Sequence, residues 1–115
     1  MYIMNLFWWS KKREPTGHRY SDIKYISSFG DAPKELGNTI FIVKNGDKKK
    51  WAIFSCPDNC GRRVEVNLMK SKIPFWHLKI KRGKVTLYPS IVVKGCNAHF
   101  WLVDNKINWS FTNID

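Results

Sequence analysis

The sequence predicts a mainly β protein, a single small sandwich or partly open barrel built from hairpins, with an irregular N-terminal segment. Short β-branched and aromatic segments recur at regular spacing, and polar turn sequences separate them. Six tryptophans and 15% aromatic residues in 115 also suit a small β protein, whose limited core large rings can fill. We expect an apolar and basic extension over residues 1–20 and one β-rich domain over residues 21–115.

The first half of the domain contains one clear hairpin. Residues 39–43 and 51–54 are both β-branched and aromatic, and the Asn-Gly-Asp sequence at 45–47 is a strong tight-turn signal. Upstream, residues 23–26 can begin a strand. Residues 31–37 resemble one short helical turn closed by glycine.

The second half continues with a strand and two more hairpins. Residues 63–68 alternate between polar and apolar side chains, which is typical of a half-buried strand. The hairpin arms are residues 75–80 with 85–88 around a turn at 81–84, and residues 100–103 with 107–111 around a turn at 104–106. This spacing of short strands favours a sandwich or barrel over a helical fold.

The net charge of +11 and the pI near 9.8 limit the class of partner that the protein can bind. Such a protein is attracted to polyanions or to an acidic protein. The lysines and arginines are spread along the chain in short groups, so a solvated surface explains most of them and nucleic acid is not the expected partner.

Three cysteines make an odd count, which fits a closed disulfide framework poorly and indicates a reducing compartment. The apolar run at residues 2–9 is too short to cross a bilayer, and the basic cluster follows it, whereas a secretory signal places the basic residues first. We therefore expect a soluble cytoplasmic protein without a membrane partner. This run docks on the main body or presents an aromatic patch to a partner.

The cysteines are candidates for a structural zinc site. Cys56 and Cys60 form one short pair, and Cys96 and His99 form a second one far along the chain, which is the usual layout of such a site. Asp58 or a water can take a vacant position. The alternative is that reduced cysteines act as small apolar fillers of the core.

Ser90 and His99 suggest a different chemistry. They stand nine positions apart with Gly95 between them, so two antiparallel strands would bring the hydroxyl close to the imidazole. A zinc-bound imidazole has committed its lone pair, so His99 cannot serve both sites. The spacing alone does not choose between a catalytic pair and a strand serine beside a packed histidine.

Several motifs occur here in the order found in one bacterial family. They are residues 56–61 (CPDNCG), 64–68 (VEVNL), 74–76 (PFW), 86–91 (TLYPSI), 96–101 (CNAHFW) and 107–109 (INW). Over about residues 31–110 the chain resembles the BubE-type proteins, which are encoded beside ubiquitin-like modifiers and their activating and conjugating enzymes in Bub operons. Members of that family are viewed as serine-dependent peptidases that trim or remove the modifier, a deubiquitinase-like role.

The resemblance implies that the β-rich domain is a catalytic one. The family's proline-serine motif falls on Ser90, and its histidine-aromatic motif falls on His99. The family's cysteines fall on Cys56, Cys60 and Cys96, although many relatives carry a further cysteine where this chain has Asp58.

On this basis we place the catalytic pair above the four-ligand zinc site. No cofactor is needed for the chemistry, and structural zinc remains an option for the cysteines. The expected partner is a bacterial ubiquitin-like protein, whose tail would add alongside an edge strand in a groove lined by Trp76, Tyr88 and Trp101. Candidates for a third catalytic group are Asp104, Glu65 and Asp58. The alternative function is a non-catalytic, zinc-stabilised β module that binds a ubiquitin-like protein or another operon product.

Overall fold

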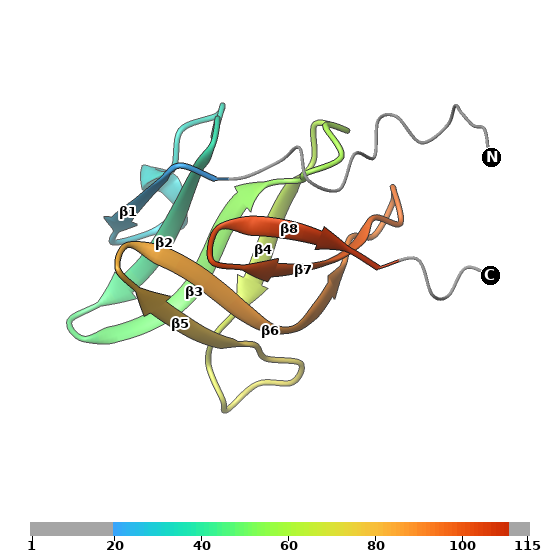
Figure 1. Ribbon diagram of the computed structural model, residues 1–115. Coiled ribbons are helices and arrows are strands. Elements are labelled where there is room, and N and C mark those ends of the chain that lie inside the picture. The colour runs from blue at the N-terminus through green and yellow to red at the C-terminus, as the bar shows by residue number, and fades with distance from the viewer. Residues whose placement is uncertain (1–19, 111–115) are drawn as a thin grey trace, which may run out of the picture.

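The computed structural model describes residues 20–110, which form two four-stranded β-sheets and one short 3₁₀ turn, η2 (Figure 1). The strands are β1 (Asp22–Ile26), β2 (Thr39–Asn45), β3 (Lys48–Ser55), β4 (Arg63–Asn67), β5 (His77–Lys81), β6 (Lys84–Val92), β7 (His99–Val103) and β8 (Lys106–Trp109). The mainly β prediction is confirmed, and the sheets do not close into a barrel. The extension predicted over residues 1–20 lies almost wholly outside the described residues.

The first sheet has the strand order β1-β2-β3-β4. β2 and β3 form the expected hairpin, with Gly46 at φ 63° in the turn, a conformation that glycine adopts without steric cost. β1 pairs with β2 in parallel, while the other pairs in this sheet are antiparallel.

The second sheet has the order β5-β6-β7-β8, and all of its pairs are antiparallel. It contains the two other hairpins, and β6 and β7 are its inner strands. Between the pairs Leu87↔Leu102 and Ile91↔Phe100 the register shifts, so that residues 88–90 of β6 lie opposite the single residue Trp101. β6 therefore carries a two-residue bulge at its serine.

The core lies between the inner faces of the two sheets. Phe54 of the first sheet and Phe100 of the second are both fully buried, and their rings meet edge to face at 6.4 Å between centroids. Alternate residues of each strand enter this core, which is why the period-2 pattern of the sequence identified the strands. This arrangement is that of a sandwich.

The helical turn expected over residues 31–37 is wrong. The 3₁₀ turn η2 spans Phe29–Asp31, and Ala32 is already extended at φ −78° and ψ 136°. The following residue is Pro33, whose ring disfavours helical geometry in the residue before it. Within residues 20–110, no helix has the length and apolar character needed to cross a bilayer.

A buried amide organises the loop between β4 and β5. Asn67 Nδ2 donates hydrogen bonds to the carbonyl oxygens of Met69 (3.2 Å), Lys72 (3.2 Å) and Pro74 (2.9 Å), while its Oδ1 accepts from the Met69 N–H (3.0 Å). The Trp76 N–H donates to the Asn67 carbonyl at 2.8 Å. One side chain thus sets the shape of the loop that leads into β5.

Changing Asn67 to aspartate should lower the free energy of unfolding by about 3 kcal/mol, because the carboxylate cannot donate and would face three carbonyl oxygens. Urea denaturation measures this loss. Asn108→Asp makes the same charge change on an exposed strand residue, and its effect should stay within about 0.5 kcal/mol. Equal losses in the two variants would show that Asn67 does not organise the loop.

Candidate active site and metal centre

The structure brings Ser90 and His99 together. Ser90 Oγ lies 3.0 Å from His99 Nε2, a hydrogen-bond distance, and both side chains are half-buried. Ser90 comes from the bulge of β6, and His99 is the first residue of β7. A hydroxyl in contact with an unprotonated imidazole nitrogen can lose its proton to the ring as it attacks an electrophile.

The antiparallel pairing of β6 and β7 creates this contact. Val92 pairs with His99 and Ile91 with Phe100, so the chain reverses direction between the strands through the loop that contains Gly95. Ile91 and Phe100 point into the core and are buried, which leaves Ser90 and His99 on the outer side of the sheet. The bulge then brings the serine alongside the imidazole.

Trp76 fixes the backbone of the serine from the neighbouring segment. Its Nε1–H donates to the Ser90 carbonyl oxygen at 3.2 Å, and its ring packs partly against the core. The sequence predicts Trp76 in a substrate groove, and the spacing of 14 residues between Trp76 and Ser90 has no periodic signature that would indicate this bond.

The other two expected groove residues lie side by side. The rings of Tyr88 and Trp101 have centroids 5.8 Å apart, and Tyr88 is 58% exposed. His77 continues this row at 6.3 Å from Tyr88, and Phe75 lies 5.3 Å from His77. An aromatic row therefore crosses the outer face of the second sheet next to Ser90, whereas Trp76 lies partly in the core.

None of the three carboxylates considered as a third catalytic group is hydrogen-bonded to the His99 ring within the described chain. Asp104 follows the far end of β7, and its N–H donates a hydrogen bond to Thr86 Oγ1 at 3.0 Å. Glu65 lies on β4 in the other sheet, and Asp58 lies among the cysteines. The contact seen here is a pair rather than a triad.

A second group of side chains is arranged like a metal site. One ligand atom from each of Cys56, Asp58, Cys60 and Cys96 lies within 4.8 Å of the others. Cys56 Sγ and Cys96 Sγ are 3.7 Å apart, and tetrahedral zinc with Zn–S bonds of about 2.3 Å separates its sulfur ligands by about 3.8 Å. The donor set and its spacing therefore fit a metal ion such as zinc.

The local fold brings these four ligands together from both sheets. Cys56, Asp58 and Cys60 stand in the connection between β3 and β4, where the Asp58 carboxylate accepts from the Cys60 N–H at 3.0 Å. Cys96 comes from the loop between β6 and β7. A bound ion would thus join the two sheets at one end of the sandwich.

The pKa values of Cys56 and Cys60 shift in opposite directions. Burial raises the pKa of the Cys56 thiol above its ordinary value. Burial also opposes ionisation of Cys60, but hydrogen bonds from the Arg62 backbone and guanidinium hold the Cys60 pKa below its ordinary value. The Arg62 side chain lies over Gly95, where a Cβ would overlap it, so its positive charge stands beside the thiols.

His99 is not among the clustered ligands in the described residues, and its Nε2 faces Ser90 instead. Asp58 stands in the fourth position. The conflict between a zinc-bound and a free imidazole therefore does not arise in this fold, because the two sites use different side chains.

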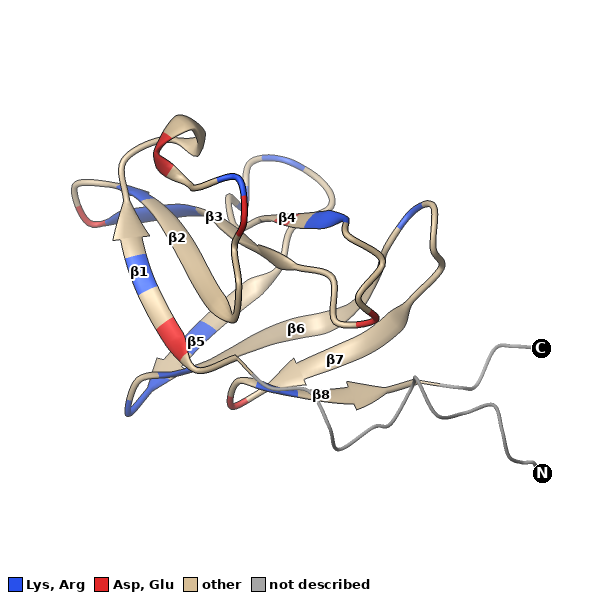
Figure 2. Ribbon diagram, turned by 90° about the horizontal axis from the view of Figure 1, so that it is seen from above, with Lys and Arg blue, Asp and Glu red and all other residues tan. Residues whose placement is uncertain are grey.

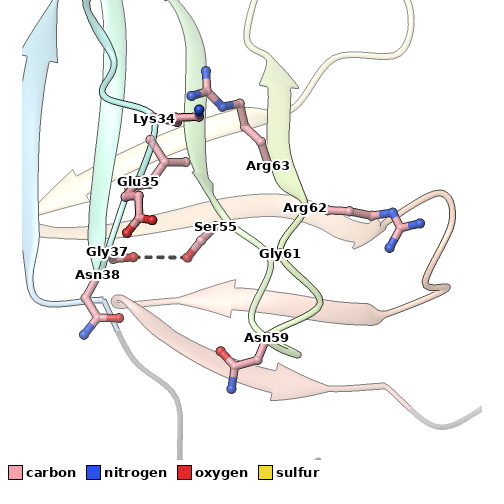
Figure 3. Close-up of a pocket in the computed structure, with 10 residues that line it drawn as sticks. Lys34, Glu35, Gly37, Asn38, Ser55, Asn59, Gly61, Arg62 and Arg63 are labelled. Carbon is pink, nitrogen blue, oxygen red and sulfur yellow. Dashed lines mark hydrogen bonds between the residues drawn. The ribbon is translucent and has the colours of Figure 1, made fainter.

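A surface cavity of about 400 Å³ lies beside the loop that carries Cys56, Asp58 and Cys60 (Figure 3). Lys34, Glu35, Asn59, Arg62 and Arg63 line it, and the Ser55 hydroxyl donates across it to the Gly37 carbonyl oxygen at 3.1 Å. Figure 3 shows the Arg62 side chain extending away from this hydrogen bond. Neither Ser90 nor His99 lines this cavity.

Comparison with known proteins agrees with the motif resemblance. A family model described as bacterial ubiquitination-like system serine protease (BubE) matches residues 29–110. No curated protein and no solved structure matches the chain. The family match spans every strand except β1, and it includes Ser90, His99 and all four clustered ligands. The chain belongs to the BubE family, the serine proteases of bacterial ubiquitination-like systems.

Proposed function

We propose that this protein is a serine peptidase that cleaves at the C-terminus of a bacterial ubiquitin-like protein, with Ser90 as nucleophile and His99 as general base. The observation that carries the proposal is the 3.0 Å contact between Ser90 Oγ and His99 Nε2 in a chain whose family is named as serine proteases. This mechanism can cleave a peptide, an isopeptide or an ester bond. We therefore describe the proposed activity as deubiquitinase-like.

The proposed reaction has two halves. Ser90 Oγ attacks the carbonyl carbon of the modifier's last residue, its proton passes to His99 Nε2, and the imidazolium then protonates the leaving amine or alcohol. Water next attacks the acyl-enzyme with His99 again as base, which releases the modifier and restores the serine. Backbone N–H groups of the Ser90 bulge or the Gly95 loop would stabilise the oxyanion, at about 3–4 kcal/mol per donor.

The same proposal assigns a structural zinc to Cys56, Asp58, Cys60 and Cys96. The spacing of the sulfurs supports it, and so does the Arg62 guanidinium, which offsets the negative charge of three thiolates and a carboxylate. The ion would cross-link the β3–β4 loop to the β6–β7 loop and would take no part in the cleavage reaction. His99 lies three residues after Cys96, so a fixed cluster would also fix the start of the strand that carries the base.

A fusion of the ubiquitin-like protein from the same system to a short C-terminal extension tests this function. The purified chain should release the extension, and intact-mass measurement of both products identifies the bond that is cut. If the fusion stays whole while the chain binds it, the non-catalytic binding module is the correct reading.

A further inference from the structure

Two adjoining surface hollows, lined by the start of β3, the loop after β4 and the start of β5, form a lysine-lined groove. Their volumes are about 440 and 510 Å³. They share Lys48, Lys49, Leu68 and Lys70, and Lys50 lines the second one. We call this surface, with its walls of Lys48–Lys50 and Lys70, the lysine groove.

The groove is held in shape by hydrogen bonds. One wall is the start of β3, where Figure 2 shows a run of basic residues beside the turn. The opposite wall is the loop that buried Asn67 organises, and the Leu68 N–H ties it to the Lys50 carbonyl oxygen at 2.9 Å. The walls of the groove are already ordered in the free protein. Binding of a partner therefore costs the protein less conformational entropy.

The charge of the groove selects an anionic partner. Four lysines line it against the single carboxylate of Asp47. Between the lysines, the apolar lining consists of Leu68 and Met69, which suit an aliphatic or extended polypeptide chain. Single-stranded nucleic acid is held by aromatic platforms interleaved with the basic groups, and here the aromatic residues gather at one end of the groove instead.

That aromatic end leads towards the serine. Phe75, Trp76 and His77 line the first hollow, and Trp76 Nε1 donates to the Ser90 carbonyl oxygen at 3.2 Å. The His77 ring neighbours Tyr88, two residues before Ser90. A chain lying in the lysine groove thus continues across the aromatic row to the reactive pair.

We infer that the lysine groove binds an acidic segment of the polypeptide substrate, and so selects substrates that carry Asp or Glu residues near the scissile bond. This inference rests on the proposed function for its link to the scissile bond, while the binding itself needs no catalysis. Opposite charges would act on both the affinity and the rate of encounter.

The test uses the full chain carrying Ser90→Ala, so that binding is measured without turnover, and the probe is a fluorescein-labelled octaglutamate peptide. Fluorescence polarisation gives its affinity at low and at physiological salt. The groove variant is Lys48→Glu with Lys49→Glu and Lys70→Glu. Its control is Lys81→Glu with Lys84→Glu and Lys106→Glu, three exposed lysines outside the groove that change the net charge equally.

The groove variant should lose about tenfold or more in affinity, and the control should lose no more than about twofold, because screened charges act mainly over a Debye length of about 10 Å. Equal losses in both variants would overturn the inference, since net charge alone would then explain binding. The inference would also be overturned if an eight-nucleotide thymidine strand bound more tightly than octaglutamate and only the groove variant lost that binding. If wild type leaves the modifier fusion whole but octaglutamate binding still depends on the groove, the peptidase proposal fails and the acidic-peptide site stands.

Discussion

Ser90→Ala lowers the kcat for cleavage of the modifier fusion by about 10³-fold or more, because the variant has no oxygen to form the acyl-enzyme. The side chain is half-buried on the outer side of the second sheet, so loss of one oxygen leaves the core intact. Single-turnover assays with the purified fusion measure the rate. A serine-directed phosphonate provides a second readout, since it should add its mass to the wild-type peptide containing Ser90 and to no peptide of the variant.

Ser27→Ala is the matched control, since it removes an exposed serine hydroxyl far along the chain from the reactive pair and should keep full activity. His99→Ala should lower kcat about as much as Ser90→Ala does. Combining the two changes should lower kcat little further, because the effects of residues that act as a unit are not additive. Undiminished cleavage by the Ser90 variant would exclude this serine as the nucleophile.

Removal of the proposed zinc should cause the largest loss of stability. Cys56 and Cys96 are 40 residues apart, and a cross-link that closes a loop of this length is worth about 4 kcal/mol in the chain-entropy relation. Cys56→Ser, or dialysis against a strong chelator, should therefore lower the free energy of unfolding by about 4 kcal/mol. Urea denaturation gives the loss, and a colorimetric chelator counts the zinc released per chain.

Asp58→Cys is the matched variant for this experiment. It keeps four ligands and restores the cysteine that many relatives carry, so it should retain one zinc per chain and wild-type stability. Adding zinc back should restore the dialysed wild type but not Cys56→Ser. A wild-type protein that contains no zinc and loses no stability with the chelator would leave the cysteines as packing residues.

The strands were predictable because each has a periodic or turn signal. The Asn-Gly-Asp turn and the β-branched residues 39–43 defined the first hairpin, and the alternation at residues 63–68 defined β4. The spacing of Ser90 and His99 around Gly95 allowed a contact between antiparallel strands without requiring it, and the fold brings the two side chains to 3.0 Å. These are local patterns, and local geometry determines their outcome.

The missed features depend on contacts between distant residues. Nothing in the spacing of Cys56, Cys60, Cys96 and His99 says which side chains point inward together. The sequence therefore favoured His99 as the fourth ligand and offered Asp58 as a substitute, and the fold places Asp58 in the cluster. The buried role of Asn67 and the Trp76 bond to Ser90 likewise have no periodic signature. The two-residue bulge of β6 is a backbone irregularity, which hydrophobic alternation does not report.

The strand order has a consequence for inhibitor design. Ser90 and His99 lie on β6 and β7, the inner strands of the second sheet, and the edge strands are β5 and β8. β5 pairs with β6 only as far as Tyr88, so the β6 backbone at Ser90 has no strand partner on that side. A scissile segment that crosses the outer face of the sheet would pass over Tyr88 and Trp101 before it reaches Ser90. Flat scaffolds that cover the rings of Tyr88 and Trp101 should therefore compete with the substrate.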